Sequence, residues 1–249
     1  MTEMKIEDYL AQGGKLTNPS NVPARYRAEL MRLMATFVDS ELAGAAGFAD
    51  VINAGPGIKE RIAAAKIVME KTDNADKVLK IMGEFGANTE KYANHHPWAD
   101  RLPRDADIGT NRTEGDMRLA VFNYPLAGWS DAVVMNLLMG LAVGVQMKEF
   151  TQVSYAPLAE AFREIAPVEA RHAELAAEGL ERMSADNRQA SVDYWWPRVA
   201  ASFGKDVSTR ATQLEAYGLR SATNAELREE WAATAAKALE NFGLTAPKG

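Results

Sequence analysis

Four long segments with apolar residues at helical spacing constrain the fold of this chain more than any other feature. The first follows Pro23, which suits the first turn of a helix, and places Leu30, Met34 and Phe37 on one face. Almost no stretch has the alternating pattern of a strand. The chain is therefore predicted to be all-α. The other long segments span about 58–85, 129–150 and 155–183, and shorter helical segments are expected at 187–203 and 224–242.

A long polar connection separates the second and third of these segments. It includes "NHHPWADRLPRDADIGTNRTEGD", which is rich in Pro, Asp, Asn and Gly and has no helical period. Two long helices, a long crossover and two more long helices are the plan of a ferritin-like four-helix bundle. Since no linker divides the chain, residues 1–249 are expected to form a single ferritin-like helical domain with additional C-terminal helices.

Composition limits the chemistry and the partners. With 47% hydrophobic residues, the 249-residue chain can bury a sizeable core. Its net charge of -6 and its interspersed charges argue against a nucleic-acid surface. The absence of cysteine excludes disulfides, thiolate metal sites and iron–sulfur clusters. No continuous apolar run reaches the length of a membrane span, and "MTEMKIEDYLAQGGK" has no signal-peptide core, so we expect a cytoplasmic protein without membrane contacts.

Each long segment also carries an acidic residue where its apolar stripe should continue. Glu41 is in line with the apolar face of the first, and Asp131 with that of the third. In the fourth, Glu169 and His172 form a Glu-x-x-His pair, whose spacing places both side chains on one face of a helix. In the second, Glu70 is followed by an aspartate at the same spacing.

This set of side chains is typical of a two-metal carboxylate site. Bundles hold two iron or manganese ions with one carboxylate from each of two helices and a Glu-x-x-His pair from each of the other two. Buried carboxylates repel one another unless cations neutralise them. The residues expected to bind metal are Glu41, Glu70, Asp73, Asp131, Glu169 and His172.

Taken singly, these residues have simpler interpretations. Glu41 or Glu70 alone could be solvated at the edge of a helix, and Asp131 could sit in the first turn of its helix, where the dipole favours a carboxylate. Asp73 could point to solvent and pair with Lys77 one turn later. In the connection, His95 and His96 are expected at the surface rather than at a metal. The aromatic "YWWP" at 194–197 is expected in a core or an interface.

Several strings together resemble a known family. They are "SELAG", "AKIVMEKTD", "FNYPLAGWSD", "VEARH", "YWWP" and "TNAELREEW", in family order from about residue 18 onward. With these strings the chain resembles the catalytic subunit of the bacterial ring-1,2-phenylacetyl-CoA epoxidase, and more distantly benzoyl-CoA epoxidase. The resemblance implies a ferritin-like fold whose di-iron centre activates O₂ to epoxidise an aromatic ring carried as a CoA thioester.

The family's metal positions fall on Glu41, Glu70, Asp131, Glu169 and His172 of this sequence. One position departs from the family, because the first Glu-x-x-His pair reads Glu70-Lys-Thr-Asp73 here. Asp73, or Asn74 with a shift of one residue, stands in place of the histidine. An added oxygen donor makes a site harder and favours a manganese-containing pair such as Mn/Fe over two iron ions.

The leading interpretation is a di-metal oxygenase that uses O₂ on an aromatic substrate. A separate reductase would supply electrons, because no flavin or iron–sulfur motif is present. The alternative from another class is a non-catalytic scaffold subunit that has lost a ligand and pairs with an active homologue. Iron storage is a third interpretation, which the family strings disfavour. In the first two cases the chain should associate with a homologous helical subunit or with itself, as a dimer or larger.

Overall fold

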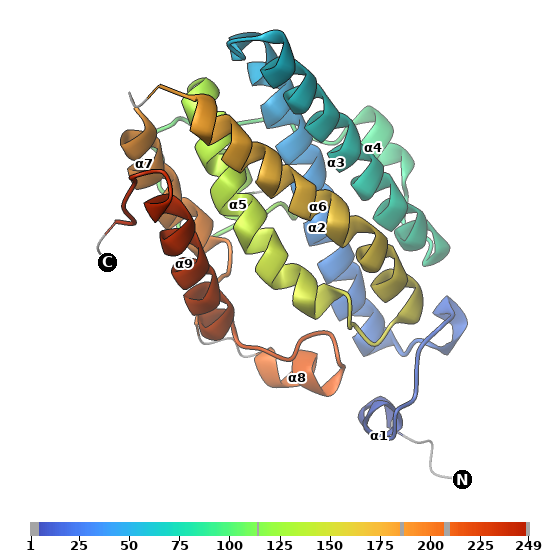
Figure 1. The fold of residues 1–249 in the computed structure, drawn as a ribbon. Helices are drawn as coiled ribbons and strands as arrows, with labels where there is room; N and C mark the ends of the chain where they lie inside the picture. The colour runs from blue at the N-terminus through green and yellow to red at the C-terminus, as the bar shows by residue number, and fades with distance from the viewer. Residues whose placement is uncertain (1–4, 114, 185–186, 207–209, 248–249) are drawn as a thin grey trace.

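The four long helices predicted from the sequence form the body of the molecule. The computed structural model describes residues 5–113, 115–184, 187–206 and 210–247. In these, α2 (Ala24–Val51) packs against α3 (Ile58–Glu84), α5 (Trp129–Phe150) packs against α6 (Ala156–Arg182), and α3 also packs against α6. The two pairs lie side by side in one bundle (Figure 1). The all-α, ferritin-like prediction is confirmed.

The C-terminal helices cover one side of this bundle. Helices α7 (Arg188–Ala201) and α9 (Asn224–Glu240) both pack against α5, and they lie at the opposite edge from α3 (Figure 1). Both were predicted within a few residues. Short helical elements were not predicted, because too few residues show a period. These are α1 (Ile6–Ala11), α4 (Glu90–Asn94), α8 (Ala211–Ala216) and the 3₁₀ turns η1 (Pro19–Asn21), η2 (Ile52–Ala54) and η3 (Ala120–Asn123).

Helix α5 is the core helix of the fold. It is long and apolar enough to cross a membrane by length and composition, which was not expected from the sequence, but 72% of its most apolar window is buried inside the protein. Its neighbours α6, α7 and α9 surround it. Leu138 and Ala142 are fully enclosed, and the Leu138 carbonyl accepts a hydrogen bond of 3.0 Å from the indole N–H of Trp231. Burial on all sides explains a helix that is apolar around most of its circumference.

The long connection is anchored to α2 through buried polar groups. His96 was expected at the surface but is buried, with its ring stacked between Tyr92 and Trp98 at centroid distances of 4.8 and 5.3 Å. Its Nε2 lies 3.1 Å from Oδ1 of Asp39 on α2. The guanidinium of Arg118, also buried, donates to backbone carbonyls within the connection, including that of Asp100 at 2.9 Å. This region is therefore packed structure rather than a loose loop.

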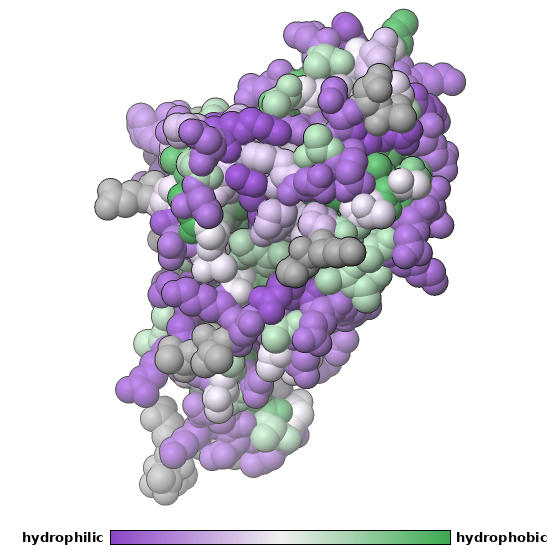
Figure 2. Space-filling model, turned by 90° about the vertical axis from the view of Figure 1, so that its left-hand side faces the viewer, coloured by the Kyte–Doolittle hydropathy of each residue, from purple (hydrophilic) through white to green (hydrophobic). Residues whose placement is uncertain are grey.

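The aromatic segment of α7 packs inside the chain. Trp195 is fully buried, and Trp196 lies against Trp231 of α9 with ring centroids 4.6 Å apart. Of the two environments predicted for "YWWP", the segment therefore occupies a core. The face that carries α7 and α9 presents mostly hydrophilic residues with scattered apolar ones (Figure 2).

Candidate functional site

The inward face of α3 determines which side chains can enter the centre of the bundle. Its buried positions recur at three- and four-residue steps, and two of them, Lys71 and Asn74, are polar. Glu70 lies beside this stripe with 22% of its side chain exposed, and Asp73 is exposed. The residues after Glu70 and Asp73, rather than these two acids, therefore face inward. The buried positions of α3 are Ala64, Ile67, Lys71, Asn74, Ala75, Val78, Ile81 and Met82.

Lys71 places an ammonium group between two buried carboxylates. Its Nζ lies 3.0 Å from Oε1 of Glu41 on α2 and 3.0 Å from Oε2 of Glu169 on α6. All three residues are at most 5% exposed. Since an unpaired charge is very costly in such an environment, the lysine and the carboxylates stabilise one another.

Two further side chains complete the cluster. The Asn74 amide donates to Glu169 Oε1 at 2.9 Å and to Glu41 Oε2 at 3.4 Å. The ring of His172 is buried, with Nδ1 3.3 Å from Glu169 Oε1 and Nε2 2.9 Å from Glu70 Oε2. Glu70 thus reaches the cluster from its edge, through the histidine.

The charges of this cluster balance without any further cation. Burial, together with the nearby charge of Glu169, raises the pKa of Glu41 to about 8. Burial opposes the charged forms of Glu169 and Lys71, but their mutual attraction outweighs it, lowering the pKa of Glu169 and raising that of Lys71. At neutral pH Glu41 therefore keeps a proton, and the charge of Glu169 is matched by that of Lys71.

Asp131 is not brought into this cluster. Its carboxylate lies at the first turn of α5, where Arg104 Nη1 is 2.6 Å from Oδ2 and the Ala127 backbone N–H donates to Oδ2 at 2.9 Å. The Ser191 hydroxyl donates to its Oδ1 at 2.7 Å. Burial alone would raise the pKa of Asp131, but these hydrogen bonds lower it. Of the six predicted ligands, the structure therefore brings together Glu41, Glu70, Glu169 and His172, and leaves Asp73 and Asp131 outside.

The side chains present do not fit a two-metal centre. Where such a bundle needs a second Glu-x-x-His pair on the inward face of α3, the same three-residue spacing here carries Lys71 and Asn74. An ammonium donates hydrogen bonds and cannot be a ligand while protonated, and it takes up the carboxylate oxygens that would bind metal. In the described parts of the chain, no three Asp, Glu or His side chains are arranged to hold a metal ion.

Sequence reasoning missed Lys71 and Asn74, although a signal was present. Counting from Ile67, the apolar stripe of this helix continues through residues 71, 74 and 78. The acids at 70 and 73 lie about 100° away from these positions around the helix axis. Residues were selected because they can bind metal, so a cation within the stripe itself was passed over.

Comparison with known proteins agrees with this fold and this arrangement of helices. The family model described as "Phenylacetic acid catabolic protein" matches residues 4–249. The chain belongs to the phenylacetic acid catabolic protein family. A similar protein is one of the subunits of 1,2-phenylacetyl-CoA epoxidase from Escherichia coli (strain K12), which is 23% identical over 255 residues. The match covers 98% of this chain and 77% of the relative.

A cavity reaches the same cluster from another side. It has a volume of about 300 Å³ and lies between α2 and α5. Glu41 forms part of its wall together with apolar residues such as Phe37, Met139 and Val143. In this member of the phenylacetic acid catabolic protein family, an apolar space therefore adjoins a carboxylate that is paired with lysine.

Proposed function

We propose that this chain is a non-catalytic helical subunit of a multicomponent oxygenase, in which Lys71 takes the place of the metal ions. The observation that carries the proposal is the ammonium of Lys71 between Glu41 and Glu169, at 3.0 Å from each. Its buried position follows from the register of α3, so freeing the site would require more than a change of side-chain rotamer. The family supports the wider context, because the Escherichia coli relative belongs to an epoxidase with several subunits.

This proposal revises the leading interpretation from the sequence. The retained acids and His172 were taken to favour an active centre, since buried ligands without a metal would be costly. Lys71 removes that argument, because it neutralises Glu169 and hydrogen-bonds Glu41 directly. The cluster can then persist as a structural link between α2, α3 and α6.

Metal analysis of matched variants tests the proposal. The purified wild-type chain should contain far less than one transition-metal ion per chain after growth with ample iron and manganese. The double variant Lys71→Glu/Asn74→His builds a Glu-x-x-His pair on the inward face of α3 and should gain metal. The control Lys71→Glu/Asp73→His has its histidine at an exposed position and should gain less. Wild-type protein with two bound metal ions would instead support the di-metal oxygenase.

The cavity beside Glu41 favours a second candidate function, which is binding of an aromatic substrate. Its apolar lining suits an aromatic ring, and arginines such as Arg112 and Arg220 also line it. By the name of the Escherichia coli relative, the ligand to try is phenylacetyl-CoA. Calorimetric titration should then show saturable binding that the filling substitution Val143→Phe weakens, with free CoA as the control. Equal binding of CoA and phenylacetyl-CoA, or none of either, would reject this role.

A further inference from the structure

The outer side of α3 carries an apolar stripe that no part of the described chain covers. Ile58, Ile62 and Met69 are 76%, 62% and 57% exposed, and Ala65 between them is also exposed. These four positions are separated by four, three and four residues, so they form a straight line along the helix. In the described residues, the only other large apolar side chain with comparable exposure is Tyr9 of α1. We call Ile58, Ile62, Ala65 and Met69 the outer stripe.

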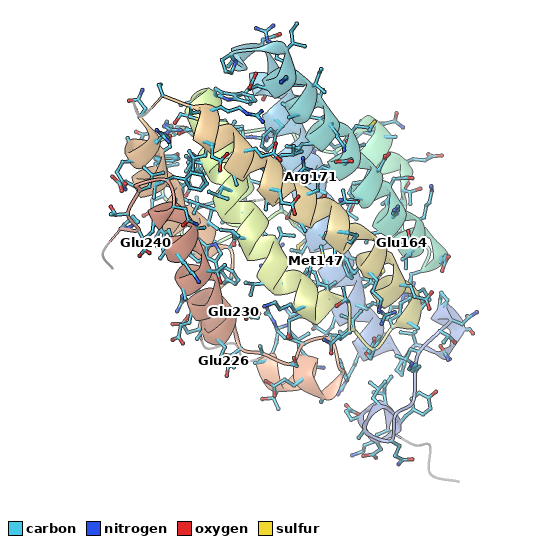
Figure 3. The ribbon with its side chains drawn as sticks, in the orientation of Figure 1. Met147, Glu164, Arg171, Glu226, Glu230 and Glu240 are labelled. Carbon is cyan, nitrogen blue, oxygen red and sulfur yellow. The ribbon has the colours of Figure 1, made fainter. Side chains whose placement is uncertain are left out.

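The outer stripe is separate from the face of α3 that builds the core. The buried residues Ala64, Ile67 and Lys71 lie about half a turn from it around the helix axis. Helix α3 also lies at the edge of the bundle, away from α7 and α9 (Figure 1). The neighbouring outer face of α6 is charged: Glu164 pairs with Lys77 at 3.2 Å, and Arg171 pairs with Glu174 at 2.8 Å (Figure 3).

Apolar residues at these steps are typical of a helix that packs against another helix on that side. The stripe is about 17 Å long at 1.5 Å per residue, which makes it the centre of a helix–helix contact and not a whole interface. An interface normally combines such an apolar centre with a polar rim. The charges beside the outer stripe therefore indicate what kind of helix it accepts.

Those charges are mainly positive. Lys59 has no carboxylate partner in the described part of the chain, and Arg61 donates only to the backbone carbonyls of Gly55 and Asn53, at 3.0 and 3.2 Å. Lys66, on the other flank, has Glu70 at 3.6 Å. The N-terminal end of α3 begins at Ile58 and adds the positive end of its helix dipole. The region is positive although the whole chain has a net charge of -6.

We infer that the outer stripe binds a helix of a different protein chain, with apolar residues at three- and four-residue steps and Asp or Glu beside them. This rests on the proposed function only in taking the chain to be part of a larger complex. A second copy of the same helix fits poorly. In an antiparallel pair centred on the stripe, Arg61 of one copy faces Lys66 of the other, and in a parallel pair each cation meets its equivalent. Like charges placed in this way weaken association.

Site-specific cross-linking in the native host tests the inference on the full chain. A photoreactive residue replaces exposed Thr72, at the end of the stripe, and in a control protein it replaces exposed Lys237 on α9. Cross-linked peptides are then identified by mass spectrometry. The expected product joins residue 72 to a helix of another protein that has acidic residues beside an apolar stripe. Cross-links to a second copy, to a helix with basic flanks, or no more product than at position 237 would overturn the inference.

Substitutions then measure the contact with the purified partner. Ile62→Glu should weaken binding by about tenfold or more, and Ile62→Ser should weaken it less. Because the Ile62 side chain is exposed, circular dichroism should show both variants folded. Lys59→Glu should weaken binding about two- to fivefold and Lys237→Glu not at all. Equal affinity for all four variants would contradict the inference. Metal content is measured on the same samples, so two bound metals with the contact intact would reject only the proposed function.

Discussion

At the scale of single residues, Lys71 has the largest expected effect on stability. It is the cation that compensates buried Glu169, and Glu41 accepts a hydrogen bond from it. We expect Lys71→Met to lower the free energy of unfolding by about 3–5 kcal/mol, because it leaves a buried carboxylate without a partner. Urea denaturation measures the change.

A second substitution separates lost charge pairing from lost packing. In Lys71→Met/Glu169→Met the unpaired carboxylate is gone, so much of the lost stability should return. Exposed Lys80→Met on the same helix should have little effect. If the double variant is no more stable than Lys71→Met, the ion pair is not what stabilises the centre of the bundle.

At the scale of helices, the approach of α5 to α6 depends on one glycine. A Cβ on Gly140 would lie 2.8 Å from the Cβ of Ala173, whereas a Cβ on Gly144, one turn later, would meet nothing within 4 Å. We expect Gly140→Ala to destabilise the protein by about 1–3 kcal/mol through overpacking. Gly144→Ala should instead be neutral or stabilising by up to about 1 kcal/mol. Thermal unfolding of the two variants should therefore move in different directions, and equal shifts would rule out this contact as the cause.

The end of α5 is joined to the segment before α9 by a carboxylate. Glu149 accepts hydrogen bonds from the Ser221 hydroxyl at 2.8 Å and from the Ala222 backbone N–H at 3.1 Å. Burial alone would raise its pKa, but these bonds lower it below the ordinary value of 4.5. A lowered folded-state pKa gives stability that is present above pH 4.5 and is lost as the pH falls through the folded value.

Glu149→Gln should therefore be less stable than wild type at neutral pH, and the difference should shrink as the pH falls below the ordinary value of 4.5. Denaturation midpoints measured across this range give the comparison. Glu240→Gln, at an exposed position of α9, serves as the control and should show no such convergence. A gap between Glu149→Gln and wild type that stays constant with pH would contradict the role of the charge.

At the scale of the whole molecule, the long connection is held by buried charge. The Arg118 Nε donates to Asp116 Oδ2 at 2.7 Å, and the Met117 and Leu119 N–H groups donate to Asp39 and Ser40 of α2. Arg118→Met leaves Asp116 without this cation. We expect faster amide hydrogen exchange across residues 95–118, while α5 and α6 keep their protection. Uniformly faster exchange throughout the chain would instead show that the connection and the bundle unfold together.

Much of the fold could be predicted because apolar period and punctuation are local properties of the sequence. The bounds of α3 and α5 follow from residues such as Gly57 and Gly128, which precede them, and from the apolar steps inside them. The same local reasoning failed for His96. Its neighbours in sequence are polar, and only distant Asp39 and the stacked Tyr92 and Trp98 explain its burial.

By itself, the sequence determined the helices, their order and the family strings. It also determined that Glu41, Glu169 and His172 face the interior, because each continues an apolar stripe that can be read without knowing the neighbouring helix. The tertiary structure decided what those residues meet. A difference of one position along α3 rotates a side chain by about 100°, which places Lys71 between the two carboxylates and leaves Asp73 outside. Whether acids on separate helices share a metal or a lysine depends on how the helices are rotated against one another, and that is fixed only when they pack.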